Sequence, residues 1–176
     1  FQNYSSLKAI TFPDSLKSIG SEAFYSCSSL TSVVIPNSVV TICDEAFNLC
    51  KNLEKVTLSK NLKHIGGYAF SNTAIKEITI PESVKTMRND AFSYCAQLTK
   101  VDIKGSLTKI ENSAFYNCTA LTTISLPSTL EYIGKWAFQN CSSLAEISFP
   151  KSLSYVGNVA FDGTKWLKNQ GDGMIY

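Results

Sequence analysis

Hydrophobic positions recur along the whole chain at a nearly constant interval. The clearest marker is a phenylalanine that usually follows an alanine, and successive copies lie 23 residues apart except for one interval of 22. A fold built from unrelated elements has no reason to keep such a period, whereas stacked copies of one supersecondary unit do. The pattern therefore predicts a solenoid whose coils are marked by Phe1, Phe24, Phe47, Phe70, Phe92, Phe115, Phe138 and Phe161.

Each copy also contains a short apolar segment of fixed form, for example Leu30-x-x-Val33-x-Ile35. Its last two apolar residues alternate with polar ones, which is typical of a half-buried strand. Seven such segments predict a main parallel sheet of about seven short strands. They lie within residues 7–12, 30–35, 53–58, 75–80, 98–103, 121–126 and 144–149.

A corner and a second apolar pair follow each of these segments. The corner usually reads Pro-x-Ser, as at Pro36, and proline both ends ladder pairing and starts a turn. The next apolar pair, such as Val39 and Ile42, predicts a second set of shorter strands. Glycine often comes directly afterwards, and we expect a positive φ at these glycines, because that conformation is cheap only for glycine. They are Gly20, Gly66, Gly134 and Gly157.

The portion around each Ala-Phe pair has the length of a single helical or 3₁₀ turn. We expect its phenylalanine to fill the interior, where burial of one Phe contributes on the order of 2 to 3 kcal/mol. Five cysteines stand three residues after a phenylalanine, so they belong to the same repeating framework. The predicted structural ladder is Phe24, Phe47, Phe70, Phe92, Phe115, Phe138 and Phe161, with Cys27, Cys50, Cys95, Cys118 and Cys141.

The cysteines are spaced as repeat positions and not as zinc ligands of the C-x₂-C type. We interpret them as small buried thiols that donate weak hydrogen bonds to the turn backbone. Neighbouring rungs lie within disulfide range, so Cys27 with Cys50 or Cys118 with Cys141 could bond, but stacked side chains that point alike argue against it. Cys43 stands at a glycine position, where we expect exposure.

Composition excludes several classes of function. Lys and Arg number 16 against 14 Asp and Glu, and no basic cluster indicates nucleic-acid binding. No apolar run approaches the roughly 20 residues that span a bilayer, so we expect no membrane insertion of this segment. His64 is the only histidine, and we interpret it as a solvated repeat position. We identify no catalytic residue, cofactor site or metal site, and nothing supports a hydrolase.

The repeat resembles the BspA-like leucine-rich repeat family over nearly the whole chain. The likeness rests on the register of Ala-Phe, Cys, Leu-x-x-Ile and Pro-x-Ser, seen best in residues 27–47, 118–138 and 141–161. It implies a right-handed, curved, β-rich leucine-rich-repeat solenoid, placed by convention in the α/β class. It also implies a protein on the surface of, or secreted by, bacteria or some parasitic protists, with a role in adhesion.

We expect residues 1–165 to form one repeat domain of about seven 23-residue repeats. Residues 166–176 then form an exit segment or a partial C-terminal cap, as the Gly-Thr-x-Trp sequence of residues 163–166 resembles the exit of repeat blocks in this family. Phe1 already stands at a repeat position, which indicates a fragment of a longer protein.

The residues that vary from coil to coil lie on the outward side of the main strands. One interpretation is a solvated face in which Lys55, Glu77 and Lys100 form modest cross-strand ion pairs. The other is a long, shallow recognition surface, typical of solenoids that bind extended partners. The candidate ligand face consists of Thr11, Ser32, Val34, Lys55, Thr57, Glu77, Thr79, Lys100, Asp102, Thr123, Ser125, Glu146 and Ser148.

The leading hypothesis is a non-enzymatic adhesion module that binds a host, matrix or microbial protein through this face, with a glycan as another possible partner. The alternative is a structural spacer that holds another domain away from the cell. The second segment adds two columns suited to an acidic protein or glycan, although a row of lysines is usually only solubilising. These columns are Lys17, Lys63 and Lys85, and Lys109, Tyr132 and Tyr155.

Overall fold

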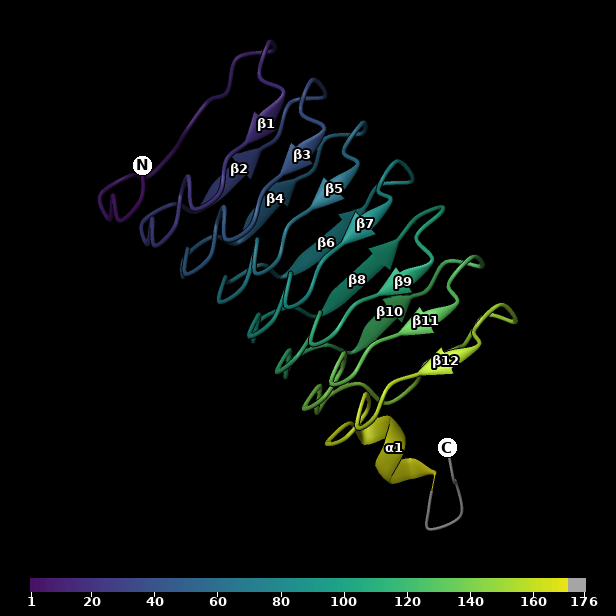
Figure 1. The fold of residues 1–176 in the computed structure, drawn as a ribbon. Helices are drawn as coiled ribbons and strands as arrows, with labels where there is room; N and C mark the ends of the chain where they lie inside the picture. The colour runs from purple at the N-terminus through teal and green to yellow at the C-terminus, as the bar shows by residue number, and fades with distance from the viewer. Residues whose placement is uncertain (171–176) are drawn as a thin grey trace.

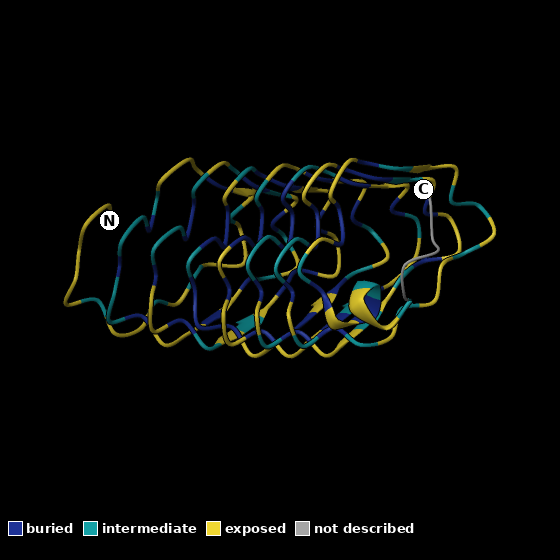
Figure 2. Cartoon of the chain, turned by 90° about the horizontal axis from the view of Figure 1, so that it is seen from below, coloured by how far each residue is buried: buried dark blue, intermediate teal, exposed yellow. Residues whose placement is uncertain are grey.

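Each copy of the repeat forms one coil, and the coils stack in sequence order along one axis (Figure 1). The structure is a computed structural model that describes residues 1–170. Each coil contributes short strands to two sets, and within each set the strands of neighbouring coils pair in parallel. Figure 2 shows that buried segments recur at the same place in successive coils.

The main strands come from the predicted half-buried segments. They are β2 (Ser32–Val34), β4 (Lys55–Thr57), β6 (Glu77–Ile80), β8 (Lys100–Ile103) and β10 (Thr123–Ser125). The structure differs from the expected seven at both ends, because residues 7–12 and 144–149 form no strand. β2 pairs with β4, and β6, β8 and β10 form a separate sheet. The break between β4 and β6 coincides with the copy that is one residue shorter.

The second set of strands is complete over seven coils, although each strand has only two residues. It comprises β1 (Ser18–Ile19), β3 (Thr41–Ile42), β5 (His64–Ile65), β7 (Thr86–Met87), β9 (Lys109–Ile110), β11 (Tyr132–Ile133) and β12 (Tyr155–Val156). The first four form one sheet and the last three another. The isoleucine, methionine or valine that ends each strand faces the core, so the preceding residue lies on the outside.

The phenylalanines stack directly on one another through the interior. From Phe1 to Phe161, successive ring centroids lie 5.1 to 5.7 Å apart and the planes differ by 11° or less. The amide of Phe24 donates to the Ala46 carbonyl at 2.8 Å, and the same bond recurs from coil to coil up to Phe138 and Ala160. The Ala-Phe turns therefore form a third hydrogen-bonded ladder, which holds the ring stack at the pitch of the coils.

The Ala-Phe segment is a run of tight turns and not a helical turn. Gly20 O accepts from Ala23 N at 3.3 Å, and Phe24 O accepts from Cys27 N at 3.2 Å, as in a 3₁₀ turn. However, Glu22 and Ser26 have φ near 55°, which interrupts any right-handed helix. The expected i to i+3 bonds are present, whereas the helical backbone is not.

The expectation of a positive φ at Gly20, Gly66, Gly134 and Gly157 is wrong. The left-handed residues lie two positions later and are Glu22, Glu45, Tyr68, Asp90, Ser113, Trp136 and Val159. Close packing explains the glycine instead at three of these places. A Cβ at Gly66 would lie 2.4 Å from Asp44 N, one at Gly134 would lie 2.6 Å from Asn112 N, and one at Gly157 would lie 2.4 Å from Lys135 N, all backbone atoms of the preceding coil.

We therefore expect Gly66→Ala to lower the free energy of unfolding by about 1 to 3 kcal/mol, the range for overpacking. The added methyl group meets backbone that cannot rotate away, so the two coils must separate locally. Urea unfolding followed by circular dichroism measures the change. Gly20→Ala is the matched control, because no atom lies within 4 Å of its Cβ position. Equal losses in the two variants would contradict this explanation.

Helix α1 (Lys165–Asn169) packs against the last coil. The Thr164 hydroxyl accepts from Leu167 N at 3.1 Å and caps the helix. Trp166 packs edge-on against Phe161 and Phe149, with centroids 5.1 and 5.4 Å away. The final part of the predicted exit segment, residues 171–176, lies outside the described residues. Over residues 1–170, no helix has the length and hydrophobicity that crossing a bilayer requires.

Candidate interaction surface

The outward residues of the main strands form two exposed columns. In the first, Ser32 lies beside Lys55, and Glu77, Lys100 and Thr123 are in register. In the second, Val34 lies beside Thr57, and Thr79, Asp102 and Ser125 are in register. Asp102 is partly buried, and the other residues of these columns are exposed. Thr11, Glu146 and Ser148 are also exposed, but they lie in the end segments that form no strand.

The expected ion pairs between Lys55, Glu77 and Lys100 do not form. The ion pairs among residues 1–170 are instead Lys76 with Glu54 at 2.8 Å, Lys104 with Asp102 at 2.8 Å and Arg88 with Asp44 at 3.4 Å. The hydrogen bond from the Lys76 ammonium lowers the pKa of the Glu54 carboxyl. The central charges of the candidate face therefore remain available to solvent or to a partner.

Two hollows lie at the ends of this face. One of about 580 Å³ is lined by Thr11, Val34 and Thr57, and one of about 370 Å³ is lined by Thr123, Glu146 and Ser148. Each lies where an end segment fails to pair as a strand with its neighbour, β2 or β10. The exposed charges Lys55, Glu77 and Lys100 therefore lie between two shallow depressions.

Beneath the surface, the cysteines form a hydrogen-bonded ladder of their own. Each ladder thiol donates to the carbonyl of a phenylalanine in a preceding coil at 3.0 to 3.1 Å. Thr73 and Thr164, which replace cysteine in two coils, donate to the phenylalanine carbonyl of their own coil. All six cysteines are free thiols, so neither Cys27–Cys50 nor Cys118–Cys141 is a disulfide. Burial raises the pKa of Cys50 to about 12 and that of Cys95 to about 11.

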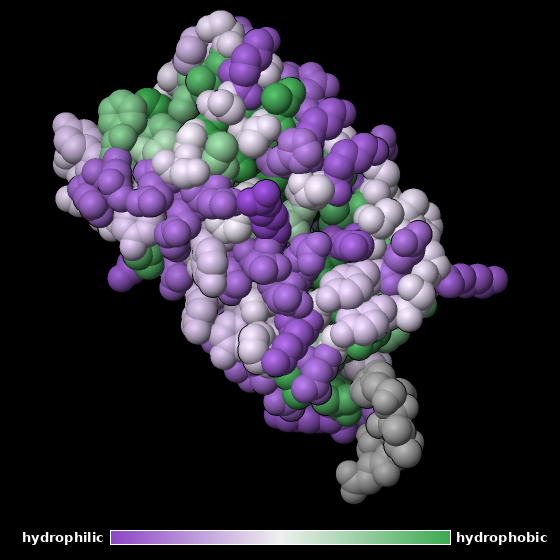
Figure 3. Space-filling model, viewed as in Figure 1, coloured by the Kyte–Doolittle hydropathy of each residue, from purple (hydrophilic) through white to green (hydrophobic). Residues whose placement is uncertain are grey.

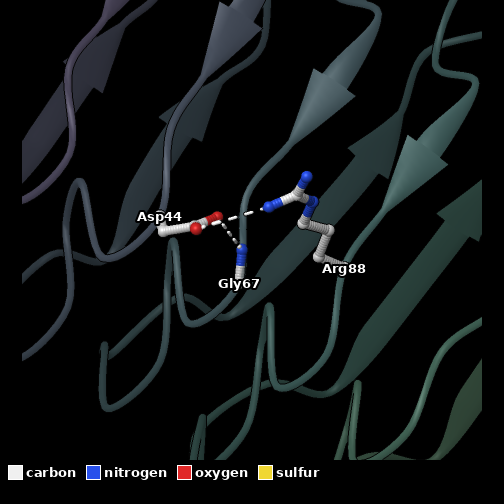
Figure 4. A network of polar contacts seen from close by, with 3 residues as sticks. All are labelled: Asp44, Gly67 and Arg88. Carbon is white, nitrogen blue, oxygen red and sulfur yellow. Dashed lines mark hydrogen bonds and ion pairs between the residues drawn. The ribbon is translucent and has the colours of Figure 1, made fainter.

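The second set of strands carries a polar cluster that the sequence reasoning missed (Figure 4). The Asp44 carboxylate accepts from Gly67 N at 2.7 Å and contacts the Arg88 guanidinium at 3.4 Å. His64 is exposed, as expected, and its Nδ1 lies 2.8 Å from Thr86 Oγ1. The chain's only arginine and only histidine thus line one hollow of about 280 Å³. The sequence signal that could have located this hollow is that Arg88 and His64 are the only residues of their types and lie near the Gly66-Gly67 pair.

Cys43 lines the same hollow and is only half-exposed, so its side chain is less accessible to solvent than expected. Within residues 1–170, no group of three or more histidine, cysteine, aspartate or glutamate side chains is arranged to hold a metal ion.

Comparison with known families decides the identity of the repeat. The model of the BspA type leucine rich repeat region matches the chain with six copies, over residues 1–99 and 69–170. The chain belongs to the BspA-type leucine-rich repeat family. The predicted family and the predicted solenoid fold are both confirmed. No curated protein matches the chain in sequence.

Solved structures of bacterial leucine-rich repeat proteins share this architecture. A leucine-rich repeat protein from Bacteroides ovatus has a TM-score of 0.63 at 25% identity, and the match covers 95% of this chain and 57% of that protein. The leucine-rich repeat protein of T. pallidum has a TM-score of 0.60 at 25% identity, with 82% of this chain and 79% of that protein covered.

The pneumococcal vaccine antigen PcpA has a TM-score of 0.51 at 24% identity, with 78% of this chain and 44% of that protein covered, and shows the fold alone. The BspA-type repeat is thus a bacterial leucine-rich repeat solenoid, an architecture consistent with a protein-interaction module.

Proposed function

We propose that this BspA-type chain is a non-enzymatic adhesion module of a cell-surface or secreted protein. It binds a host, matrix or microbial protein through the outward face of its main strands. Residues 1–165 act as one repeat domain, and the segment after them leads out of it. The observation that carries the proposal is the row of exposed charges, Lys55, Glu77 and Lys100, which form no ion pairs with one another and lie between two hollows.

The geometry suits an extended protein surface better than a small ligand. The hollows are shallow and lie at opposite ends of the face, so only a partner that spans several coils contacts both. Stacked coils keep the columns in register without help from the outward side chains, because the interior ladders hold the coils together. The face is therefore free to vary for recognition while the fold stays the same.

The test is the triple variant Lys55→Ser, Lys100→Ser, Asp102→Ser. We expect its affinity for the immobilised matrix protein that the unmodified chain binds best to fall by about tenfold or more, equivalent to about 1.4 kcal/mol. Surface plasmon resonance with a panel of purified matrix proteins measures this. The matched control is Lys51→Ser, Asp162→Ser, Lys165→Ser, which removes the same charges from exposed residues elsewhere.

Two outcomes would favour a structural spacer instead. The first is that the unmodified chain captures no protein of the panel. The second is that the triple variant and its control bind equally well, which would show that the charged residues of the main-strand face do not contribute to binding.

A further inference from the structure

The second set of strands carries a row of exposed lysines on its outer side. Backbone hydrogen bonds link the residues at positions 17, 40, 63 and 85 of successive coils, so Lys17, Lys63 and Lys85 lie in one column. In the fifth coil Lys109, the first residue of β9, lies in the neighbouring column, in register with Tyr132. We call Lys17, Lys63, Lys85 and Lys109 the basic strip. In Figure 3, which looks onto this side of the solenoid, hydrophilic surface dominates the middle of the face.

The lysines of the basic strip lack acidic partners. Lys85 donates to the Ser106 hydroxyl at 2.7 Å, and the Lys109 ammonium lies 5.6 Å from the centre of the Tyr132 ring. Among residues 1–170, the ion pairs involve Lys76, Arg88 and Lys104, and none involves the strip. Lys63 and Lys85 directly precede the adjacent strands β5 and β7 and are linked by a backbone hydrogen bond, so their like charges repel. A bound polyanion would relieve that repulsion.

The hollow described above opens beside the strip and adds donors to it. His64, Thr86 and Arg88 line the hollow. Gly66 also lines it and adds no side chain that would fill it. One carboxylate, that of Asp44, also lines it, but this group already accepts from Gly67 N and contacts Arg88. Of the five guanidinium N–H groups of Arg88, one makes that long contact, so several remain to bind an acidic substituent.

The shape of the strip indicates a linear ligand. Four steps of about 4.8 Å separate the first coil from the fifth, so the lysines extend over roughly 19 Å along the axis. Each strand of this set is two residues long, and the strip is correspondingly narrow. In the column of Lys17, Lys63 and Lys85, Thr108 stands in the fifth coil and Glu131 in the sixth, and Tyr132 follows Lys109 in the neighbouring column, so the strip does not continue past the fifth coil.

The chemistry of the strip favours a glycan over other polyanions. A peptide cannot add as a strand within the row, because the backbone groups already pair between coils. The rings of Tyr132 and Tyr155 stack on each other at 4.6 Å, so no base fits between them as in single-stranded nucleic-acid binding. The hydroxyls of Thr41 and Thr86 lie in the column next to the lysines, which suits a polymer that carries both acidic groups and hydroxyls.

We propose that the basic strip and its adjoining hollow bind a linear acidic glycan bearing sulfate or carboxylate groups. The ammonium groups contact successive acidic substituents, and the hollow beside His64 and Arg88 holds one of them. This site is separate from the main-strand face, so it neither requires nor excludes protein binding there.

The experiment measures binding of the whole chain to immobilised heparin, with Lys63→Glu, Lys85→Glu as the test variant. We expect at least a tenfold loss of affinity, because two attractive contacts become repulsive. Lys51→Glu, Lys165→Glu is the matched control, with the same change of net charge on exposed residues away from the strip, and should change affinity by less than about twofold. Arg88→Gln should weaken binding on its own. Thermal melting checks that each variant is folded.

Three results would overturn the proposal. The unmodified chain does not bind heparin, or the test and control variants lose affinity equally, or poly-glutamate or single-stranded DNA binds as tightly as heparin at the same salt concentration. The last result would show a general response to negative charge and not recognition of a glycan.

Discussion

Phe70→Ala is expected to lower the free energy of unfolding by about 3 to 5 kcal/mol, the range for truncating a buried aromatic residue. The Phe70 ring is fully buried and stacks on Phe47 at 5.4 Å and on Phe92 at 5.3 Å. Its removal leaves a cavity in the middle of the stack and takes away two ring contacts, each worth about 0.5 to 1.5 kcal/mol beyond buried area. Urea denaturation followed by circular dichroism gives the value.

Phe1→Ala is the matched control for Phe70→Ala. Phe1 is 63% exposed and stacks on Phe24 only, so the same truncation should cost much less there. A loss under about 1 kcal/mol in Phe70→Ala would show that the phenylalanine column is not the core of the solenoid.

Alkaline pH is expected to destabilise the chain through its buried thiols. In the unfolded chain cysteine has a pKa of about 8.5, whereas in the fold Cys50 has a pKa of about 12 and Cys95 of about 11. Above pH 8.5 the unfolded chain therefore releases protons that the folded chain keeps, and stability falls as pH rises. Between pH 8 and pH 10.5 each of these two thiols should cost about 2.5 kcal/mol.

The double variant Cys50→Thr, Cys95→Thr isolates this contribution, since threonine does not titrate and already occupies the ladder position at Thr73 and Thr164. Urea unfolding at several pH values should show a shallower loss of stability in the variant. Tyrosine and lysine also titrate in this range, but they are shared by both proteins. If stability fell equally with pH in the variant and in the unmodified chain, the thiols of Cys50 and Cys95 would have the same pKa in the folded and unfolded states.

The repeat period predicted much of this molecule because every coil has nearly the same length. A residue such as Phe70 then falls beside Phe47 and Phe92 whatever the details of the turns, and Cys95 falls beside the turn backbone. The same reasoning correctly separated Val33, which is buried, from Ser32 and Val34, which are exposed. Columns of the solenoid follow from counting residues.

Contacts between columns did not follow from counting. Lys55 and Glu77 were expected to pair, yet Lys76 pairs with Glu54 one position earlier, because β4 and β6 do not form a continuous ladder at the short copy. The glycines were expected to supply positive φ, yet that role belongs to residues such as Glu22 and Tyr68. The distance between adjacent backbones, and not the conformation of one residue, explains Gly66.

The sequence by itself determined the solenoid, the order of its coils and the residues that share each column, since a fixed period admits one regular stacking. Only the tertiary structure decided which strands form at the ends, where the hollows open and which lysines lack acidic partners. These features depend on how closely each coil approaches the next. A difference of a few ångströms between coils decides whether side chains 22, 23 or 44 residues apart are in contact. Asp44 and Arg88, which are 44 residues apart, are in contact.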